Sequence, residues 1–302
     1  MLDLPEAAAQ AILALDEHWD GKGHPLGLAG EEIPLLARIL GLAQTVEVFY
    51  TSFGLDQAIA MALDRSDHWF DPELVQALIS TCGDAPFWTA LRADDIRKQI
   101  AALEPAEHVL IADEARLDRV AEAFAQVIDA KSPYTFRHSA RVAAIAVETA
   151  SSLGFSELEL RDLRRAALLH DIGKLGISNL ILDKPGALTV AEMDTVRRHP
   201  ELTQSILNRV ERFRDLAEAA ASHHEKLDGS GYHRGLVGAQ LSLPARVLAV
   251  ADIFEALTAD RPYRGPMSAE QALALMRPDA GPRLCAEAFA ALEGKAELLA
   301  AA

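Results

Sequence analysis

The sequence has few cysteines and no long apolar run. Cys82 and Cys285 are the only cysteines among the 302 residues, so a disulfide framework is not indicated and a reducing compartment is the simpler interpretation. No stretch reaches the roughly 18 uninterrupted apolar residues that a transmembrane helix needs. Residues 1–6 also lack the basic start of a signal peptide. These absences predict a cytoplasmic protein that does not bind a membrane.

Positive charge is scarce as well. The chain carries 29 Lys and Arg against 45 Asp and Glu, a net charge of −16. Because binding to a phosphate backbone requires clusters of Lys and Arg, this balance argues against a DNA or RNA polymer as partner and leaves only a local basic pocket open. Half of the residues are hydrophobic, which is enough for a real core, and the length predicts two domains or one large one.

Apolar residues recur with the period of an α-helix. Leu117, Val120, Phe124 and Ile128 would form one buried stripe, whereas the alternation typical of strands is rare. Gly, Pro and Asp-Gly signals separate the other apolar segments, as they do in a multi-helix bundle. The sequence therefore predicts an all-α fold. Its further Ala- and Leu-rich segments span 140–153, 158–172, 189–210, 212–224, 243–259 and 268–277.

The first hundred residues contain a copy of a later segment. At a constant offset of 208, residues 17–47 match residues 225–255 at 13 of 31 positions, against about two expected by chance. After an apparent insertion at 261–266, the match resumes at an offset of 214, where 56–58 align with 270–272. Duplication explains this similarity, so the N-terminal part repeats the second half of the later domain.

The N-terminal copy has lost residues that bind metals. The differences are Leu15 for His223, Asp16 for His224 and Gln44 for Asp252. We therefore predict two domains with a hinge near residues 101–113. Residues 1–105 would be a metal-free helical half-domain with a structural or regulatory role, and residues 106–302 would be the catalytic domain.

The later domain carries a set of side chains suited to metal ions. Imidazoles with one or two carboxylates suit Fe, Mn, Zn or similar divalent ions, and the absence of thiolates argues against a structural zinc site. A two-metal site needs about this many ligands. The residues, in chain order, are His138, His170, Asp171, His199, His223, His224 and Asp252.

Two adjacent polar pairs carry most of this argument. His170 and Asp171 follow the apolar segment 163–169, and neighbouring side chains on a helix differ by about 100° in direction, so both can reach one cavity. His223 and His224 follow an Ala-rich segment in the same way. Burying such pairs without partners is costly, so metal binding is the favoured interpretation. We assign no chemical role to His18, His24, His68 and His108.

Five motifs identify a family resemblance over about residues 114–280. Their order and spacing resemble the HD-GYP branch of the HD-domain metal-dependent phosphohydrolases. The motifs are YTFRHSARV (134–142), LLHDIGKLGI (168–177), KPGALT (184–189), HHEKLDGSGYHRGL (223–236) and DRPYR (260–264).

This resemblance implies an HD-type helical bundle and a metal-dependent phosphodiesterase. The expected substrate is a cyclic dinucleotide, above all cyclic di-GMP, which would be opened to pGpG and hydrolysed on to GMP by metal-activated water. All seven ligand positions hold the residue that the family pattern requires, with Asp171 as the bridging carboxylate. Lys174 matches the lysine that contacts phosphate, Arg261 and Arg264 fall where basic residues hold the other phosphate, and Arg141 matches a further arginine.

Two departures from the family pattern bear on the site. The signature Gly-Tyr-Pro reads Gly231-Tyr232-His233, which removes the fixed φ of proline and predicts a more mobile loop. Relatives with three metals carry a glutamate where Tyr134 stands, so we expect two divalent ions, with Fe or Mn preferred and Zn, Ni or Mg as alternatives.

Two other functions stay open. The chain would then be a phosphohydrolase of another nucleotide or phosphoester, or a receptor that holds a cyclic dinucleotide without turnover.

The half-domain leaves an apolar face uncovered, which predicts a homodimer through this part or packing on the catalytic domain.

Overall fold

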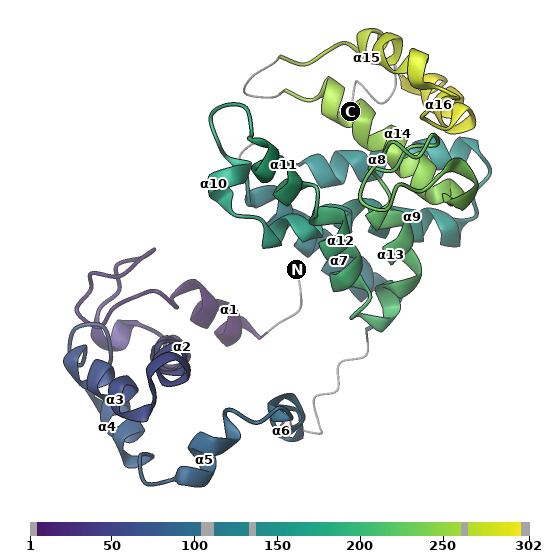
Figure 1. Ribbon diagram of the computed structural model, residues 1–302. Helices are drawn as coiled ribbons and strands as arrows, with labels where there is room; N and C mark the ends of the chain where they lie inside the picture. The colour runs from purple at the N-terminus through teal and green to yellow at the C-terminus, as the bar shows by residue number, and fades with distance from the viewer. Residues whose placement is uncertain (1–4, 104–111, 133–136, 261–264, 297–302) are drawn as a thin grey trace. The chain divides into compact units, whose positions relative to one another are not determined.

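The computed structural model describes residues 5–103, 112–132, 137–260 and 265–296 (Figure 1). Within these residues the regular structure consists of α-helices, short 3-10 helices and isolated β-bridges, so the predicted all-α fold is confirmed. The chain divides into two compact units, Asp3–Ile111 (unit 1) and Ala112–Ala302 (unit 2). None of the described helices is long and apolar enough to cross a membrane.

Unit 1 has a small core built mainly on one long helix. Leu42, Val46 and Tyr50 of helix α2 are buried against helices α3 to α5, and the hydroxyl of Tyr50 donates to the carbonyl of Trp88 at 2.7 Å. The helices are α1 (Glu6–Leu13), α2 (Leu35–Phe53), α3 (Leu55–Asp64), α4 (Pro72–Ser80), α5 (Ala85–Ala90) and α6 (Ile96–Ala102).

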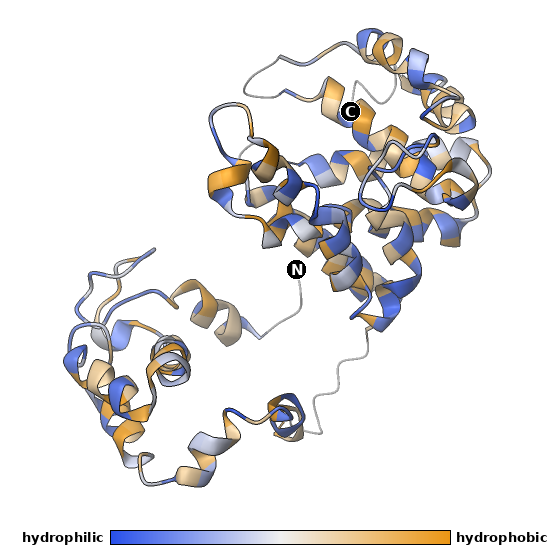
Figure 2. Ribbon diagram, viewed as in Figure 1, coloured by the Kyte–Doolittle hydropathy of each residue, from blue (hydrophilic) through white to orange (hydrophobic). Residues whose placement is uncertain are grey.

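Unit 2 is a larger bundle. The helices are α7 (Glu114–Ala130), α8 (His138–Ser152), α9 (Glu157–Leu169), α10 (Asn179–Leu182), α11 (Val190–Val196), α12 (His199–Leu207), α13 (Arg214–Ala221), α14 (Leu243–Thr258), α15 (Ala269–Met276) and α16 (Ala286–Glu293). In Figure 2 many of them carry both hydrophobic and hydrophilic residues, as expected of helices that bury one face.

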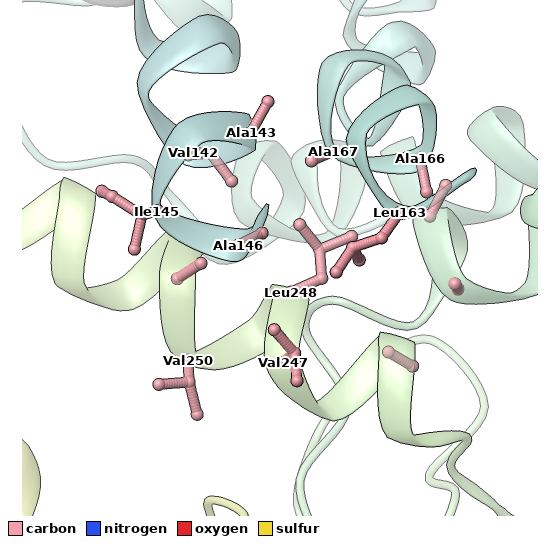
Figure 3. Packing of buried hydrophobic residues seen from close by; sticks show 14 of the residues in the cluster. Val142, Ala143, Ile145, Ala146, Leu163, Ala166, Ala167, Val247, Leu248 and Val250 are labelled. Atoms are coloured by element: carbon pink, nitrogen blue, oxygen red, sulfur yellow. The ribbon is translucent and has the colours of Figure 1, made fainter. Parts of the chain in front are cut away.

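The core of unit 2 lies where α8, α9 and α14 meet. Val142 and Ala146 of α8, Leu163 of α9 and Leu248 of α14 point toward one another (Figure 3), and all four are almost fully buried. Alanines at the other contact positions allow the helix axes to approach closely. This packing fixes the start of α8, the end of α9 and the middle of α14, which carry site residues.

Helix α7 buries the predicted face except for one residue. Leu117 and Ile128 are buried and Val120 is partly buried against the same core, but Phe124 is 40% exposed, and Ala121 and Ala125 lie in the core. The apolar period predicts the helix correctly, but hydrophobicity alone places the large side chain of Phe124 in the core, where it does not lie. The small residues face the neighbouring helices because only they allow close helix packing.

The two units share backbone features at equivalent positions. Gly21 and Gly229, at the offset of 208, both have a φ of 76°, a left-handed conformation that favours glycine. The β-bridge Ser66 to Phe70 has its counterpart between Ala280 and Leu284, at the offset of 214. Helices α2, α3 and α4 thus correspond to α14, α15 and α16. The repeat seen in the sequence is also a repeat of backbone conformation.

The loop that follows the histidine pair is anchored by a buried glutamate. The carboxylate of Glu225 accepts hydrogen bonds from the backbone N–H of Arg234 at 2.7 Å and of Leu236 at 3.0 Å. In unit 1, Glu17 accepts from the equivalent N–H groups of Leu26 and Leu28. The loop is therefore held by this carboxylate, although His233 stands in place of the proline of the family signature.

Replacing Glu225 by glutamine is expected to loosen this loop. The amide has one acceptor oxygen, so one of the two backbone N–H groups loses its partner, at a cost of about 1–3 kcal/mol. Hydrogen exchange at the amides of Arg234 and Leu236 should accelerate, and the melting temperature should fall. Exchange rates equal to those of the wild type would contradict the anchoring role. The variant Glu17→Gln tests the same bonds in unit 1.

Candidate metal centre

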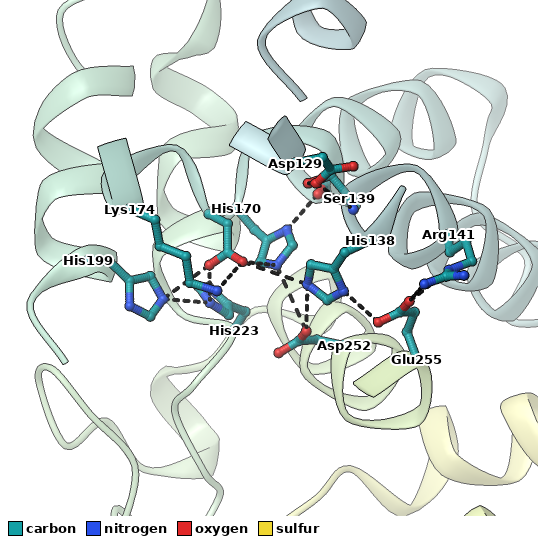
Figure 4. Close-up of polar contacts among 12 residues, drawn as sticks. Asp129, His138, Ser139, Arg141, His170, Lys174, His199, His223, Asp252 and Glu255 are labelled. Atoms are coloured by element: carbon teal, nitrogen blue, oxygen red, sulfur yellow. Dashed lines mark hydrogen bonds and ion pairs between the residues drawn. The ribbon is translucent and has the colours of Figure 1, made fainter. Parts of the chain in front are cut away.

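Seven side chains from five parts of unit 2 converge on one point. Figure 4 shows His138, His170, His199, His223 and Asp252 among them. The seven side chains are carried by the ends of helices, except for the residue from α14, which lies inside its helix. His138 begins α8, His170 and Asp171 follow α9, His199 begins α12, His223 and His224 follow α13, and Asp252 lies within α14. All seven predicted ligand residues are thus brought together.

Asp171 lies between two groups of imidazoles. Its Oδ1 is 3.2 Å from Nε2 of His199 and 3.8 Å from Nε2 of His223. Its Oδ2 is 3.4 Å from Nε2 of His170 and 3.6 Å from Nε2 of His138. One oxygen therefore faces each group, which is the arrangement that a carboxylate bridging two ions requires.

Asp252 lies beside the group formed by His138 and His170. Its Oδ1 lies 3.4 Å from Nε2 of His138 and 3.8 Å from Nε2 of His170, and its Oδ2 lies 3.9 Å from Nδ1 of His224. The potential ligand atoms form three sets, and within each set all atoms lie within 4.8 Å of one another. The sets are His199, His223 and His224; His138, His170 and Asp252; and His170, Asp171 and His223.

Helix ends orient three of the imidazoles. Nδ1 of His170 donates to the carbonyl of Ala167, and the same bond joins His199 to Val196 and His223 to Ala220 (each 2.7 Å). In all three cases the accepting carbonyl belongs to the residue three positions before the histidine, in the preceding helical turn. Because a carbonyl can only accept, the proton lies on Nδ1, and Nε2 carries the lone pair that faces the centre.

Burial favours the neutral form of His199, His223 and His224. Desolvation lowers the pKa of His199 to about 3 and holds the pKa of His223 well below its usual range. The pKa of His224 is also lowered, chiefly by desolvation. A neutral imidazole offers a lone pair to a metal ion at neutral pH, whereas a protonated one does not.

The two carboxylates remain ionised in spite of burial. Desolvation alone would raise the pKa of Asp171, but the charge of Lys174 and the proximity of His170 outweigh it and hold the pKa well below the usual range. For Asp252, desolvation is likewise outweighed by the hydrogen bond to His138, and its pKa is lowered. The centre therefore presents negative charge to a cation.

Two buried atoms test whether the residues fit a metal. Nε2 of His170 and Oδ1 of Asp171 are buried without a hydrogen-bond partner among the described residues. Leaving such groups unsatisfied costs about 1–3 kcal/mol each. Both atoms face the point where the potential ligand atoms converge, and nitrogen and carboxylate donors suit divalent transition ions. The residues present fit a metal centre.

Metal affinity is expected to rise with pH. Burial lowers the pKa of His138, but hydrogen bonds to Asp252 and Glu255 outweigh it and raise the pKa to about 9. Below that pH an ion must displace this proton, so the apparent affinity for Mn²⁺ should fall by up to about tenfold per pH unit. Calorimetric titration with Mn²⁺ at several pH values in buffers of different ionisation enthalpy measures both the affinity and the released proton. An affinity independent of pH would contradict the assignment.

The side chains predicted to contact phosphate differ in where they lie relative to the metal centre. Nζ of Lys174 is 2.5 Å from Oδ2 of Asp171, at the edge of the centre. Arg141 is half-exposed and pairs with Glu255, with Nε 2.7 Å from Oε1. Arg261 and Arg264 lie outside the described residues, as does Tyr134, on which the expected number of ions depends.

Two residues near the centre were missed by the sequence interpretation. Glu255 contacts His138, and the ring of Tyr232 lies 4.7 Å from that of His224. Tyr232 was named only as part of a signature. For Glu255 the one available signal was its position three residues after Asp252, on the same face of a helix.

The sequence profile of the HD domain family matches residues 1–74 and 122–285, which is more than half of the chain. The chain belongs to the HD domain family. The resemblance to HD-GYP proteins is thereby confirmed, and the match to residues 1–74 shows that part of unit 1 belongs to the family as well. In this HD domain protein the predicted dipeptide His170-Asp171 lies at the middle of the cluster.

Similar proteins share this domain. The HD domain protein is 46% identical to the 3′3′-cGAMP-specific phosphodiesterase 3 of Vibrio cholerae over 298 residues, which are 99% of this chain and 65% of that protein. It is 41% identical to a cyclic di-GMP phosphodiesterase response regulator of Xanthomonas campestris over 180 residues, 58% of this chain and 47% of the other.

A solved structure resembles the whole chain. The crystal structure of a cyclic GMP-AMP-specific phosphodiesterase of V. cholerae matches with a TM-score of 0.63 and 42% identity, covering 98% of this chain and 69% of that one. The HD domain protein thus spans 65% of the length of the V. cholerae relative and about half that of the X. campestris protein.

Proposed function

We propose that this HD domain protein is a metal-dependent phosphodiesterase that hydrolyses a cyclic dinucleotide. The observation that supports it best is the position of Asp171, whose two oxygens face separate groups of buried imidazoles. The names of the relatives agree with this activity, because they include enzymes specific for 3′3′-cGAMP and for cyclic di-GMP. Both dinucleotides are candidates.

The proposed centre holds two divalent ions. One group of ligands would be His199, His223 and His224, the other His138, His170 and Asp252, with Asp171 between them. When bound, such ions supply a nucleophilic water at neutral pH and neutralise charge on the phosphate. Burial favours the neutral form of His199, His223 and His224. Hydrogen bonds from Nδ1 to backbone carbonyls orient His170, His199 and His223. Fe or Mn are the proposed ions, and Zn, Ni or Mg are the alternatives to test.

Lys174 is proposed to bind the phosphate that reacts. Its ammonium group lies beside Asp171 and is partly exposed, so it can donate to a phosphate oxygen while remaining close to the centre. Hydrolysis adds water across one phosphodiester bond: the hydroxyl goes to phosphorus and the proton to the leaving 3′ oxygen. Cyclic di-GMP would yield pGpG, and a second hydrolysis would yield GMP. Arg141, Arg261 and Arg264 remain proposed substrate contacts.

Product analysis on a panel of substrates tests the function. The metal content of the purified protein is measured first, and turnover of cyclic di-GMP, 3′3′-cGAMP and other phosphoesters is then followed with Mn²⁺ and with anaerobic Fe²⁺. A linear dinucleotide or mononucleotide as product supports the proposal and names the substrate. Hydrolysis of other phosphoesters alone, or binding of a dinucleotide without product, would replace it with one of the two alternatives.

We also propose that unit 1 has a structural or regulatory role and forms a homodimer through α2. Ile39 and Leu40 are 40% and 45% exposed, whereas their equivalents in α14, Val247 and Leu248, are fully buried. An apolar face of this kind is typical of an interface. The variant Ile39→Glu should convert the dimer to a monomer in light scattering, and Leu180→Glu, on an exposed residue of unit 2, should not. A monomeric wild type would refute the proposal.

A further inference from the structure

The imidazole of His138 is held by a side chain, unlike its neighbours. Its Nδ1 lies 2.5 Å from Oε2 of Glu255, whereas His170, His199 and His223 use backbone carbonyls. His138 is the first residue of α8, and the acceptor for its ring lies on a different helix, α14.

The position of Glu255 on α14 allows its carboxylate to bind Nδ1 of His138. It lies on α14 three residues after Asp252, which puts both carboxylates on one face of the helix. Its side chain is almost fully buried, and its second oxygen, Oε1, accepts from Nε of Arg141 at 2.7 Å and pairs with Nη2 at 2.6 Å. Arg141 thus compensates the buried charge, and the two oxygens of Glu255 are divided between the arginine and the imidazole (Figure 4).

We propose that Glu255 is a positioning residue of the metal centre, which fixes the ring of His138 with Nε2 toward Asp171 and Asp252. Because Oε2 accepts from Nδ1, the proton is kept on that nitrogen and the lone pair on Nε2 is left for the ion. Arg141 holds the carboxylate in place. The inference rests on the metal centre proposed above, and it gives Arg141 a role in addition to its proposed substrate contact.

The repeat offers a matched comparison. Glu47 occupies the position in α2 that Glu255 occupies in α14. Glu47 is exposed and accepts from the hydroxyl of Thr51 at 3.0 Å. The same residue at the same helix position therefore has no imidazole to orient in unit 1, and Glu47→Gln is a control for the chemical change itself.

The test compares Glu255→Gln, Glu255→Asp and Glu47→Gln with the wild type. Mn²⁺ affinity is measured by calorimetry, the Co²⁺ absorption spectrum reports the ligand field, and thermal unfolding without metal reports stability. Glu255→Gln is expected to weaken Mn²⁺ binding by about 10- to 100-fold and to change the Co²⁺ spectrum. Glu255→Asp should recover part of the affinity, because it restores the carboxylate, and Glu47→Gln should match the wild type.

A purely structural role would give a different result. If Glu255 only ties α8 to α14 through Arg141, Glu255→Gln lowers the melting temperature and leaves the Mn²⁺ affinity of the folded protein and the Co²⁺ spectrum unchanged, which overturns the inference. Failure of the wild type to bind Mn²⁺ or Co²⁺ would instead overturn the metal centre, and with it the proposed function. The two failures are therefore distinguishable.

Discussion

Replacing Asp171 by asparagine should abolish turnover of the cyclic dinucleotide. We expect a loss of at least roughly a thousandfold, equivalent to about 4 kcal/mol of transition-state stabilisation. The physical reason is that one carboxylate faces both groups of imidazoles, with Oδ1 3.2 Å from His199 and Oδ2 3.4 Å from His170. An amide offers one weak acceptor oxygen and no negative charge, so it cannot serve both groups.

Metal content separates this effect from a loss of fold. Elemental analysis of Asp171→Asn should show fewer ions per chain than the wild type, while circular dichroism should show the same helix content. Asp16→Asn is the control, because Asp16 is an exposed residue of unit 1. Retention of both the ions and the turnover by Asp171→Asn would refute the bridging role of this residue.

Replacing Gly173 by alanine is expected to destabilise unit 2 strongly. A Cβ on Gly173 would lie 2.0 Å from the carbonyl oxygen of His199 and 2.7 Å from the backbone nitrogen of Thr203. These are backbone atoms of α12, so no change of side-chain rotamer can relieve the clash. The short 3-10 helix Ile172–Gly176 would have to move away from α12, at a cost of about 3 kcal/mol or more.

The same movement would damage the metal centre. The N–H of Gly173 donates to Oγ1 of Thr203 at 3.0 Å, and that hydroxyl donates to the carbonyl of His170 at 2.8 Å. These bonds fix the distance between His170 and His199. We expect a fall in melting temperature of roughly 6–12 °C together with weaker Mn²⁺ binding.

Thermal unfolding of a second glycine variant provides the control. Gly265→Ala adds the same methyl group where the described residues place no heavy atom within 4 Å, so its melting temperature should stay near that of the wild type. A Gly173→Ala protein as stable as Gly265→Ala, with unchanged Mn²⁺ affinity, would show that the close approach of the 3-10 helix to α12 is not needed.

Some features of the fold followed from the sequence because their causes are local. The helices begin and end at signals within one turn, such as the capping box of Ser156 and Glu159 at the start of α9. Helical periodicity predicted the all-α class for the same reason. The predicted burial of Phe124 on α7 was wrong, since it depends on which neighbouring helix packs there and not on its own segment.

The seven candidate ligands could be named in advance because the residue types themselves are unusual. Adjacent pairs such as His170-Asp171 and His223-His224 at the ends of apolar helices are costly to bury without a partner. The bridging role of Asp171 and the phosphate contact of Lys174 could be proposed only through the family resemblance. The number of ions and the substrate contacts at Arg261 and Arg264 stay predictions.

The sequence by itself determined the class of the fold, the internal repeat and the set of residues able to bind metal. Only the tertiary structure decided which oxygen of Asp171 faces which imidazole, that carbonyls in the preceding turn orient three histidines, and that Glu255 holds the fourth. The reason is physical: chemical identity and helical period belong to the chain, whereas contacts between α8, α9, α12 and α14 depend on how their side chains pack together in space.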